Sequence, residues 1–405
     1  MSTHNTPAVQ KVVDSVRRLI QTGALTPGNP LPTELALAEE LGASRNTIRR
    51  AIEALIRAGY VERLPYSRPV VVGDRPIEGS SSRDEIHVWV GQTIGDFGTS
   101  AFLRGLSAAL SRTPYRMSVR EPSSRSANGT LEERRFLMEA LRSPATAAIV
   151  MSRDAYSDNG DVLEQISNAG LPIVFVDGSP SRLPRSDFVS TANLIAAQRA
   201  VEHLIDLGHH RVVCLTDDLV PGANLERANG YRRAMSQRVK ELSPNILVAK
   251  DLPAETPGAR PASGPFVEGL NRSDYFGILA SRLAGAVLAM DPRPTALFVT
   301  CDGLAFDVCA YLEGAGVDIP ERMSVVGFDG LARFGSAPCD ELTTCQQDFE
   351  SFGTHAASLL LDRLEGGQAL DSRRILLDAP LAVRSTTTYC LPQFVADGMF
   401  KANLP

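Results

Sequence analysis

Residues 45–50, RNTIRR, carry side chains of the kind that contact DNA. Arginine matches the O6 and N7 acceptors of guanine and also pairs with phosphate, while asparagine matches adenine. If this stretch is helical, its polar members point outward together, and they are Arg45, Asn46, Thr47, Arg49 and Arg50. Such a set can both anchor a helix on DNA and contact base edges.

The apolar residues after Ser44 predict the helix that would present this set. They recur at i, i+4, i+7 and i+8, which defines one buried face, and they are Ile48, Ile52, Leu55 and Ile56. Ser44 is suited to cap the N-terminus of this helix. Gly59 is suited to end it, because glycine is common just after a helix.

A shorter helix is expected immediately before it. Thr33 can cap this helix, and we expect its apolar stripe to consist of Leu35, Ala38 and Leu41. Gly42 suits the turn between the two helices because glycine tolerates a positive φ. The pattern predicts a helix-turn-helix, although a solvated helical hairpin would share it.

The flanking segments favour the DNA-binding interpretation. An amphipathic helix ending at Gly23 is predicted by five residues at helical spacing, Val9, Val12, Val13, Val16 and Ile20. Two short strands, 60–63 and 70–72, could form a wing after the second helix. The whole stretch resembles a winged helix-turn-helix domain of the GntR family. Its matching positions are Leu31-Pro32-Thr33-Glu34, Leu37-Ala38, Gly42-Ala43-Ser44-Arg45, Thr47-Ile48-Arg49, Ala51, Leu55 and Gly59.

The resemblance implies DNA contacts for particular residues and departs from the family pattern at two places. The family's contacts carry over onto Arg45, Thr47 and Arg49. The full candidate set is Thr33, Ser44, Arg45, Asn46, Thr47, Arg49, Arg50 and Arg68. Leu35 stands where the family usually has Arg, and the wing has 64–69, LPYSRP, in place of a glycine-rich tip. Arg68 is therefore the candidate for a wing contact.

Charge is divided unevenly along the 405 residues. Residues 8–73 hold nine Arg and Lys against six Asp and Glu, so this part is +3 and the remainder of the −6 chain is −9. Such asymmetry is expected when one domain meets phosphate. A modestly basic domain favours two copies on one operator, hence a homodimer.

We expect a cytoplasmic protein with reduced cysteines and no membrane contact, because no signal-type or membrane-length apolar run is found.

The rest of the chain has the pattern of an α/β protein. We expect a DNA-binding domain at 1–73, a linker at 74–84, a larger domain at 85–388 and a tail at 389–405. Buried strands are expected at 86–90, 147–151, 172–176, 211–215, 296–300 and 323–327, with helices at 102–110 and 191–207 among those between them. Short apolar strands alternating with helices predict parallel sheets covered on both faces, and their number predicts two lobes.

Residues 85–388 resemble the effector-binding domain of LacI/GalR repressors, which is related to type I periplasmic binding proteins. The matches are Leu171 to Asp177, Ala200 to Leu204, Leu207 to His209, Arg227 to Tyr231, Pro294 to Phe298 with Asp302, Ser324 to Asp329, and Leu342 to Thr344 with Gln347. A GntR-type head on a LacI-type body resembles the arabinose-repressor family. Residues 94–105 resemble the opening strand, loop and helix of that family.

The resemblance implies which residues hold a small-molecule effector, expected to be a carbohydrate. Sugars are bound by charged and polar groups together with an aromatic ring. The candidates are Asp96, Phe97, Ser152, Asp177, Arg227, Tyr275, Asp302 and Gln347. Three alternatives stand beside these roles: a surface ion pair for Arg227, a helix N-cap for Asp302 and core packing for Tyr275. Cys301 stands where the family often has Asn.

Enzymatic and metal-binding functions are disfavoured. His203, His209 and His210 lie close in sequence, but no acidic ligand is suitably spaced, so we expect no metal. We also expect no catalytic residues and no cofactor. The four lysines lie on no convincing pocket strand, which disfavours a pyridoxal-phosphate enzyme of the GntR-headed kind. A solute-binding protein without DNA binding is disfavoured by the helix-turn-helix. The expected function is a DNA-binding transcriptional regulator whose operator affinity a small molecule controls. Repression is favoured, and activation stays open as the alternative.

Overall fold

The computed structural model describes residues 7–22, 24–25, 29–57, 60–62, 68–71, 85–91, 97–122, 129–142, 147–151, 159–178, 186–219, 222–240, 242–253, 272–331, 342–366 and 371–391. The chain divides into two compact units, Met1–Ser82 and Arg83–Pro405. The division lies at the C-terminal end of the predicted linker.

The first unit is a three-helix domain with a two-stranded sheet. Its elements are α1 (Pro7–Gln21), α2 (Glu34–Leu41), α3 (Arg45–Arg57), β1 (Val61–Glu62) and β2 (Val70–Val71). The two strands pair antiparallel, as a wing requires. Every residue of the predicted apolar face of α1 is buried, and so are Ile48, Ile52 and Leu55 of α3. Gly59 and the wing residues 63–67 lie outside the described residues.

The caps of the helix-turn-helix are confirmed, whereas one part of the predicted stripe of α2 is wrong. Thr33 and Ser44 accept hydrogen bonds from the backbone N–H groups of Ala36 and Thr47, each at 3.2 Å. Gly42 ends α2 at φ 61°. Leu35 was expected in the core but is 48% exposed, and Leu37 is fully buried in its place. Helix periodicity allows either stripe, and packing against α1 and α3 selects the one containing Leu37.

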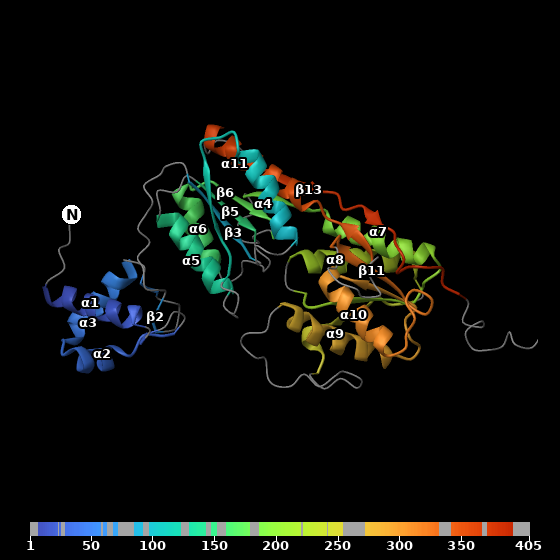
Figure 1. Cartoon of the computed structure of the whole chain (residues 1–405), viewed down its shortest axis with the longest axis horizontal. Coiled ribbons are helices and arrows are strands. Elements are labelled where there is room, and N and C mark those ends of the chain that lie inside the picture. Colours follow the sequence, from blue (N-terminus) through green and yellow to red (C-terminus); the bar gives the residue numbers. More distant parts are fainter. Residues whose placement is uncertain are drawn as a thin grey trace, which may run out of the picture. The chain divides into compact units, whose positions relative to one another are not determined.

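The second unit consists of two lobes, each built on a six-stranded sheet. The N-lobe sheet has the order β13-β7-β6-β5-β3-β4, and every pair in it is parallel. Its strands are β3 (Glu85–Val90), β4 (Arg116–Arg120), β5 (Ala147–Met151), β6 (Ile173–Val176), β7 (Asp187–Thr191) and β13 (Arg374–Leu377). Helices cover both faces, and they are α4 (Phe97–Leu110), α5 (Gly129–Arg142), α6 (Gly160–Ala169) and α11 (Phe349–Gly366) (Figure 1).

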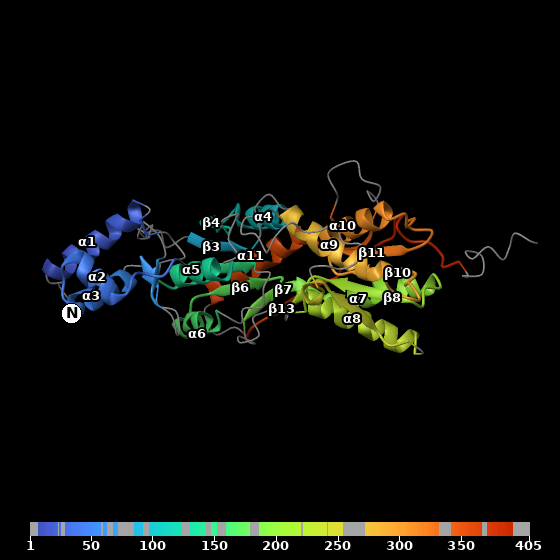
Figure 2. The same ribbon diagram turned by 90° about the horizontal axis from the view of Figure 1, so that it is seen from below.

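The C-lobe repeats this plan with the order β14-β12-β11-β10-β8-β9, in which only the edge strand β14 is antiparallel. Its strands are β8 (Val212–Thr216), β9 (Asn245–Val248), β10 (Ala296–Val299), β11 (Ser324–Asp329), β12 (Thr343–Gln346) and β14 (Leu381–Ala382). Figure 2 shows this sheet between two pairs of helices. They are α7 (Asn193–Asp206) with α8 (Ala223–Arg238), and α9 (Arg272–Leu288) with α10 (Asp302–Gly314).

Alternation along the central strands explains the layered core. In β10, Leu297 and Val299 pack in the cluster that contains residues of α9 and α10, while Ala296 and Phe298 pack in the cluster with α7 and α8. Because both faces are covered, β10 is apolar at every position. The α/β fold with two parallel-sheet lobes is thus confirmed, as are all the strands predicted above.

Sequence patterns did not indicate β4, β7, β9, β12, β13 and β14, and three of these strands are rich in polar residues. β4 is RMSVR, β7 is DFVST and β12 is TTCQ. Their neighbours in the sheet, rather than their own hydrophobicity, fix them as strands.

The chain passes between the lobes at three points in the part of the molecule that the structure describes. These crossovers lie between β7 and α7, between β12 and α11, and between β13 and β14. The first and third are joined by a hydrogen bond from the Ala192 N–H to the Leu377 carbonyl, 2.8 Å. Among the described residues, no helix has both the length and the apolar character needed to cross a bilayer.

Candidate functional site

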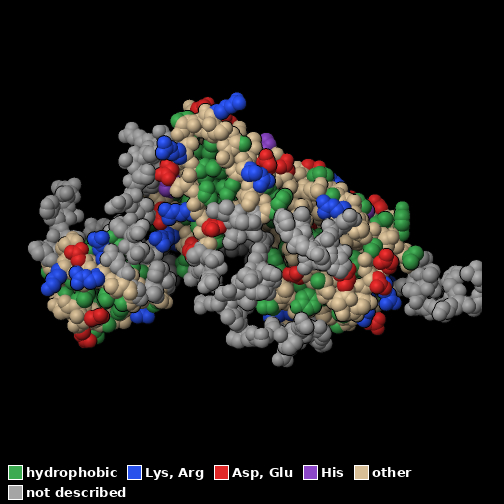
Figure 3. Space-filling model, viewed as in Figure 1, with side chains coloured by type: hydrophobic (Ala, Val, Ile, Leu, Met, Phe, Trp, Pro, Cys, Tyr) green, Lys and Arg blue, Asp and Glu red, His purple; other side chains and the backbone are tan. Residues whose placement is uncertain are grey.

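The N-terminal half of α3 presents a group of exposed polar and basic side chains. Capping by Ser44 fixes where α3 begins, and burial of Ile48 fixes its rotation. These two constraints leave Arg45, Asn46, Arg49 and Arg50 exposed, with Thr47 partly buried. Thr47 and Ser44 also share a hydroxyl hydrogen bond of 2.8 Å. Figure 3 shows basic side chains on the surface of this unit.

Two predicted DNA-contacting arginines have partners within the unit. Arg49 donates from Nε and Nη2 to the two carboxylate oxygens of Glu34, at 3.3 and 3.1 Å. Arg68 donates to the backbone carbonyl of Leu31 at 3.4 Å and so connects the wing to the segment before α2. Neither side chain is buried.

The topology of the C-lobe creates a place where polar side chains converge. The strand order reverses between β8 and β10, so the helices that follow these strands lie on opposite faces of the sheet. In open α/β sheets, ligands bind at the carboxyl ends of the strands at such a switch point. At this point the Thr300 hydroxyl donates to the Thr216 hydroxyl oxygen at 2.9 Å, and both residues are fully buried.

Arg227 reaches this position from α8 because a glycine follows it one turn later. A Cβ at Gly230 would lie 2.3 Å from the Leu194 carbonyl oxygen, so only glycine allows α8 to approach α7 this closely. Arg227 then donates from Nε to the side-chain oxygen of Asn193 at 2.8 Å and from Nη1 to the Thr300 carbonyl at 2.7 Å. The predicted Arg therefore lies at the C-lobe switch point.

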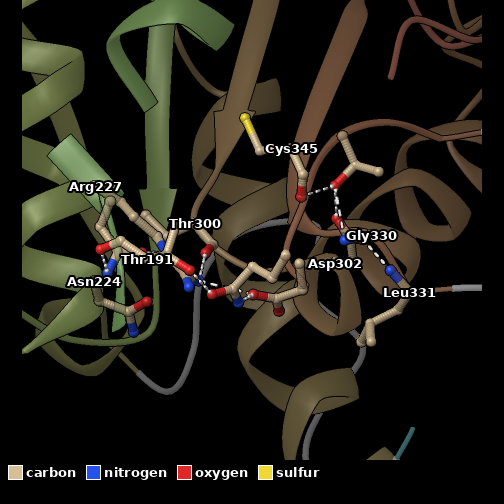
Figure 4. Close-up of polar contacts among 12 residues, drawn as sticks. Thr191, Asn224, Arg227, Thr300, Asp302, Gly330, Leu331 and Cys345 are labelled. Carbon is tan, nitrogen blue, oxygen red and sulfur yellow. Dashed lines mark hydrogen bonds and ion pairs between the residues drawn. The ribbon is translucent and has the colours of Figure 1, made fainter. Parts of the chain in front are cut away.

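Arg227 also belongs to a network that connects two crossovers (Figure 4). Its Nη1 donates to Asp329 at 3.0 Å, and the same carboxylate oxygen accepts from the Gln347 amide at 2.8 Å. The Thr191 hydroxyl donates to the Gln347 carbonyl oxygen at 2.5 Å. We call Thr191, Asn193, Arg227, Asp329 and Gln347 the crossover network.

The Arg227–Asp329 pair is buried and has several stabilising partners. The two side chains are 4% and 12% exposed, so the suggested surface ion pair is wrong. The guanidinium carbon also lies 3.9 Å from the ring centroid of Phe328. Desolvated ions need such partners, because isolated charges are costly to bury.

Asp302 lies beside this network and is fully buried as the first residue of α10. Its carboxylate accepts from the Thr344 hydroxyl and from the Leu331 N–H, both at 2.8 Å. Cys301, rather than Asp302, occupies the N-cap position. Burial raises the pKa of the Asp302 carboxyl to about 7, and the charge of Asp329 acts in the same direction.

The other predicted effector residues are not members of the crossover network. Asp177 follows β6 at φ 66°, where its carbonyl accepts from the Ser190 hydroxyl beside Thr191. Phe97 is the first residue of α4 and is 46% exposed. Tyr275 is part of α9, but its side chain lies outside the described residues, as do Asp96 and Ser152.

Sequence reasoning missed Thr191, Asn193 and Asp329. Asp329 was within a quoted motif and is the last residue of the buried strand β11, which is the signal that could have identified it. Thr191 and Asn193 gave no such signal, because β7 was not predicted and their position depends on the crossover.

Two of the three histidines considered as metal ligands, His203 and His209, have structural partners. His209 contacts the Thr295 hydroxyl and the Thr388 carbonyl oxygen, both at 3.0 Å, and His203 contacts the Thr387 hydroxyl at 3.2 Å. They hold the segment after β14 against the C-lobe. Among the residues that the structure describes, no group of three His, Cys, Asp or Glu side chains could hold a metal ion.

Two parts of the chain match known families. Residues 8–71 match bacterial regulatory proteins of the gntR family, and residues 201–387 match the periplasmic binding protein-like domain. The first match contains the helix-turn-helix, and the second contains Arg227, Asp302, Asp329 and Gln347.

Curated relatives match about two thirds of the chain or nearly all of it. The HTH-type transcriptional repressor PurR of Vibrio cholerae serotype O1 (strain M66-2) is 28% identical over 258 residues, which are 63% of this chain and 68% of the relative. The arabinose metabolism transcriptional repressor of Geobacillus stearothermophilus is 23% identical over 390 residues, covering 96% and 99% of the two chains.

A solved structure shares the fold. The complex of the transcriptional regulator CelR with cellobiose has a TM-score of 0.58 at 20% identity and covers 88% of this chain and all of its own. At this identity the likeness shows the fold alone.

Proposed function

Because the chain joins a DNA-binding domain of the gntR family to a periplasmic binding protein-like domain, we propose that it is a transcriptional repressor controlled by a small sugar. A homodimer places two copies of α3 on the half-sites of a palindromic operator. The observation that carries the proposal is the crossover network, in which charged and polar side chains suited to sugar hydroxyls converge where the two lobes connect.

The first unit supports sequence-specific DNA binding. Arg45, Asn46 and Arg50 are exposed on the first turns of α3, where a recognition helix contacts base edges. The caps at Thr33 and Ser44 fix the helices that present them. The relatives named as repressors, including the arabinose metabolism repressor that spans nearly the whole chain, favour repression.

The crossover network supports a sugar as the effector. A sugar hydroxyl both donates and accepts a hydrogen bond, so it needs a donor and an acceptor side by side. Among the described residues, none accepts from Arg227 Nη2 and none donates to the second carboxylate oxygen of Asp329. Arg227 and Asp329 can therefore pair with one hydroxyl while keeping their mutual contact. Asp302 and Asp177 are proposed to bind further hydroxyls of the same ligand.

The same network supports control of DNA binding by the ligand. Gln347 belongs to the second crossover and Thr191 ends the strand before the first. A hydroxyl bound to the second oxygen of Asp329 shares its carboxylate with the amide of Gln347, so ligand binding is coupled to a contact between the two crossovers. A difference of about 1–3 kcal/mol in ligand affinity between two lobe arrangements is sufficient for ordinary allosteric coupling.

A thermal-shift screen of the full chain against pentoses, hexoses and glycosides tests the proposal. A ligand that binds only the folded state raises the melting temperature. We expect at least one sugar to do so in the wild type and to have no effect on Gln347→Leu combined with Asp329→Asn. Stabilisation by none of the sugars would contradict the proposed effector class. Equal stabilisation of both proteins would contradict the proposed site.

A further inference from the structure

The guanidinium of Arg49 is held in place, unlike those of its neighbours on α3. It forms a two-point contact with Glu34, which is the first residue of α2. Among the residues that the structure describes, Arg45 and Arg50 have no ion-pair partner. Arg49 nevertheless stays accessible, because its side chain is 61% exposed. Glu34 therefore orients an exposed arginine without covering it.

The atoms used in this contact leave the end of the guanidinium available. A guanidinium has five N–H donors, one on Nε and two on each terminal nitrogen. The carboxylate of Glu34 accepts one hydrogen bond from Nε and one from Nη2. Both hydrogens on Nη1 and one on Nη2 remain, and one N–H from each of these nitrogens forms the fork that matches the O6 and N7 acceptors of guanine.

The charge of Glu34 acts against a phosphate contact by the same arginine. A phosphate attracts Arg49 mainly by its charge, and the carboxylate beside the guanidinium already neutralises that charge. A base edge carries no net charge, so its recognition depends on the direction of the N–H groups. The ion pair therefore weakens sequence-independent attraction and keeps the geometry needed for base contact.

We propose that Glu34 is a specificity-determining positioning residue, which holds Arg49 to contact a guanine edge instead of the phosphate backbone. The proposal rests on the proposed DNA-binding function and deepens it. It assigns Arg49 to base recognition and leaves Arg45 and Arg50 free to contact phosphate. It also gives α2 a role in recognition, although α2 itself need not touch a base.

The experiment compares Glu34→Ala, Arg49→Ala and the double variant with the wild type, using the full chain. The operator is defined by selection from a random duplex library, and binding to it and to a scrambled duplex is measured over a range of salt concentrations. Glu39→Ala is the matched control, because it removes the same charge from an exposed position of the same helix. Circular dichroism establishes that each variant retains the helices.

We expect Glu34→Ala to reduce the ratio of operator to scrambled-duplex affinity by roughly 5- to 150-fold, the range for one lost base contact. Its binding to scrambled DNA should become more salt-dependent by about 0.9 in the log–log slope, because Arg49 then contacts one more phosphate. The preference should be lost at the same base-pair position as in Arg49→Ala. In the Arg49→Ala background, Glu34→Ala should reduce discrimination no further.

Equal effects of Glu34→Ala and Glu39→Ala would overturn the inference, because both would then act only through net charge. Loss of preference at a different position from Arg49→Ala would overturn it as well. A wild-type chain that selects no sequence from the library at any salt concentration would instead contradict the proposed function. The two failures are therefore distinguishable.

Discussion

The two binding regions of this chain keep their arginines in opposite environments. On α3, Arg45 and Arg50 are exposed, and no described residue forms an ion pair with them. In the C-lobe, Arg227 is 4% exposed and donates to Asn193, Thr300 and Asp329. The first arrangement leaves donors for a large charged partner. The second fixes the guanidinium among buried polar partners, which suits the proposed recognition of a small neutral molecule.

This difference predicts different consequences of mutation. An exposed arginine contributes to binding and little to folding, because surface charges have few contacts to lose. A buried arginine contributes to both, because its removal leaves a charged partner without compensation. The predictions below test this contrast, from the largest expected effect to the smallest.

Arg227→Ala should produce the largest loss. It leaves the carboxylate of Asp329 buried without its ion-pair partner, and breaking such a pair costs about 3–5 kcal/mol of unfolding free energy. The variant should bind operator at low temperature and fail to respond to the sugar. Urea unfolding followed by fluorescence of Trp89, the single tryptophan of the chain, measures the stability. Arg227→Lys, which keeps the charge, should retain more stability, and a full sugar response of Arg227→Ala would contradict the site.

Asp302→Asn should change how stability depends on pH. The folded carboxyl has a pKa raised to about 7, while an unfolded aspartate has one of about 3.9. The folded state therefore holds its proton over a range where the unfolded state has lost it. The contribution of Asp302 to the free energy of unfolding is therefore fully present below pH 4. It declines by on the order of a few kcal/mol as the pH rises towards 7.

The asparagine variant mimics the protonated carboxyl and should lack this decline. Unfolding of both proteins in urea at pH 5 and pH 8 measures the difference. Parallel pH profiles for the wild type and Asp302→Asn would show that Asp302 does not titrate in this range.

Arg45→Ala should have a smaller effect, confined to DNA. We expect operator affinity to fall by about 1–3 kcal/mol, the contribution of one base or strong phosphate contact, with unchanged melting temperature and sugar binding. Fluorescence anisotropy with labelled operator measures it. A variant that also loses sugar binding would contradict the separation of the two regions.

Ser44→Ala should have the smallest effect. It removes the cap that accepts from the Thr47 N–H and should cost about 1 kcal/mol of local helix stability. Hydrogen exchange of the peptide 44–57 should become roughly fivefold faster. Thr22→Ala serves as the control, because the Thr22 hydroxyl donates to a carbonyl at the end of α1 and caps no helix start. Exchange that is equal in the two variants would exclude the capping role.

The same contrast explains how much the sequence could predict. The first unit was predictable because its determinants are local: Ser44 caps the helix that Ile48 orients, and both lie within one turn of Arg45. Leu35 was the exception, because α2 is only eight residues long and its rotation is set by contacts with the other helices. Periodicity alone could not choose between Leu35 and Leu37.

The crossover network was only partly predictable because its members are far apart in sequence. Arg227 and Gln347 could be found from the motifs around them. Thr191 and Asn193 could not, because they acquire their role only where the chain passes from one lobe to the other. Asp329 lies between these cases, because its position at the end of a buried strand indicated a binding residue but not the side chains that contact it.

The central claim is that sugar binding at the crossover network controls DNA binding by α3. Its most direct test is the affinity of the full wild-type chain for its selected operator, measured with and without a saturating sugar from the thermal-shift screen. The account predicts that the sugar weakens operator binding by roughly 5- to 150-fold, as expected for a coupling of about 1–3 kcal/mol. An operator affinity that stays the same while the sugar is bound would contradict it.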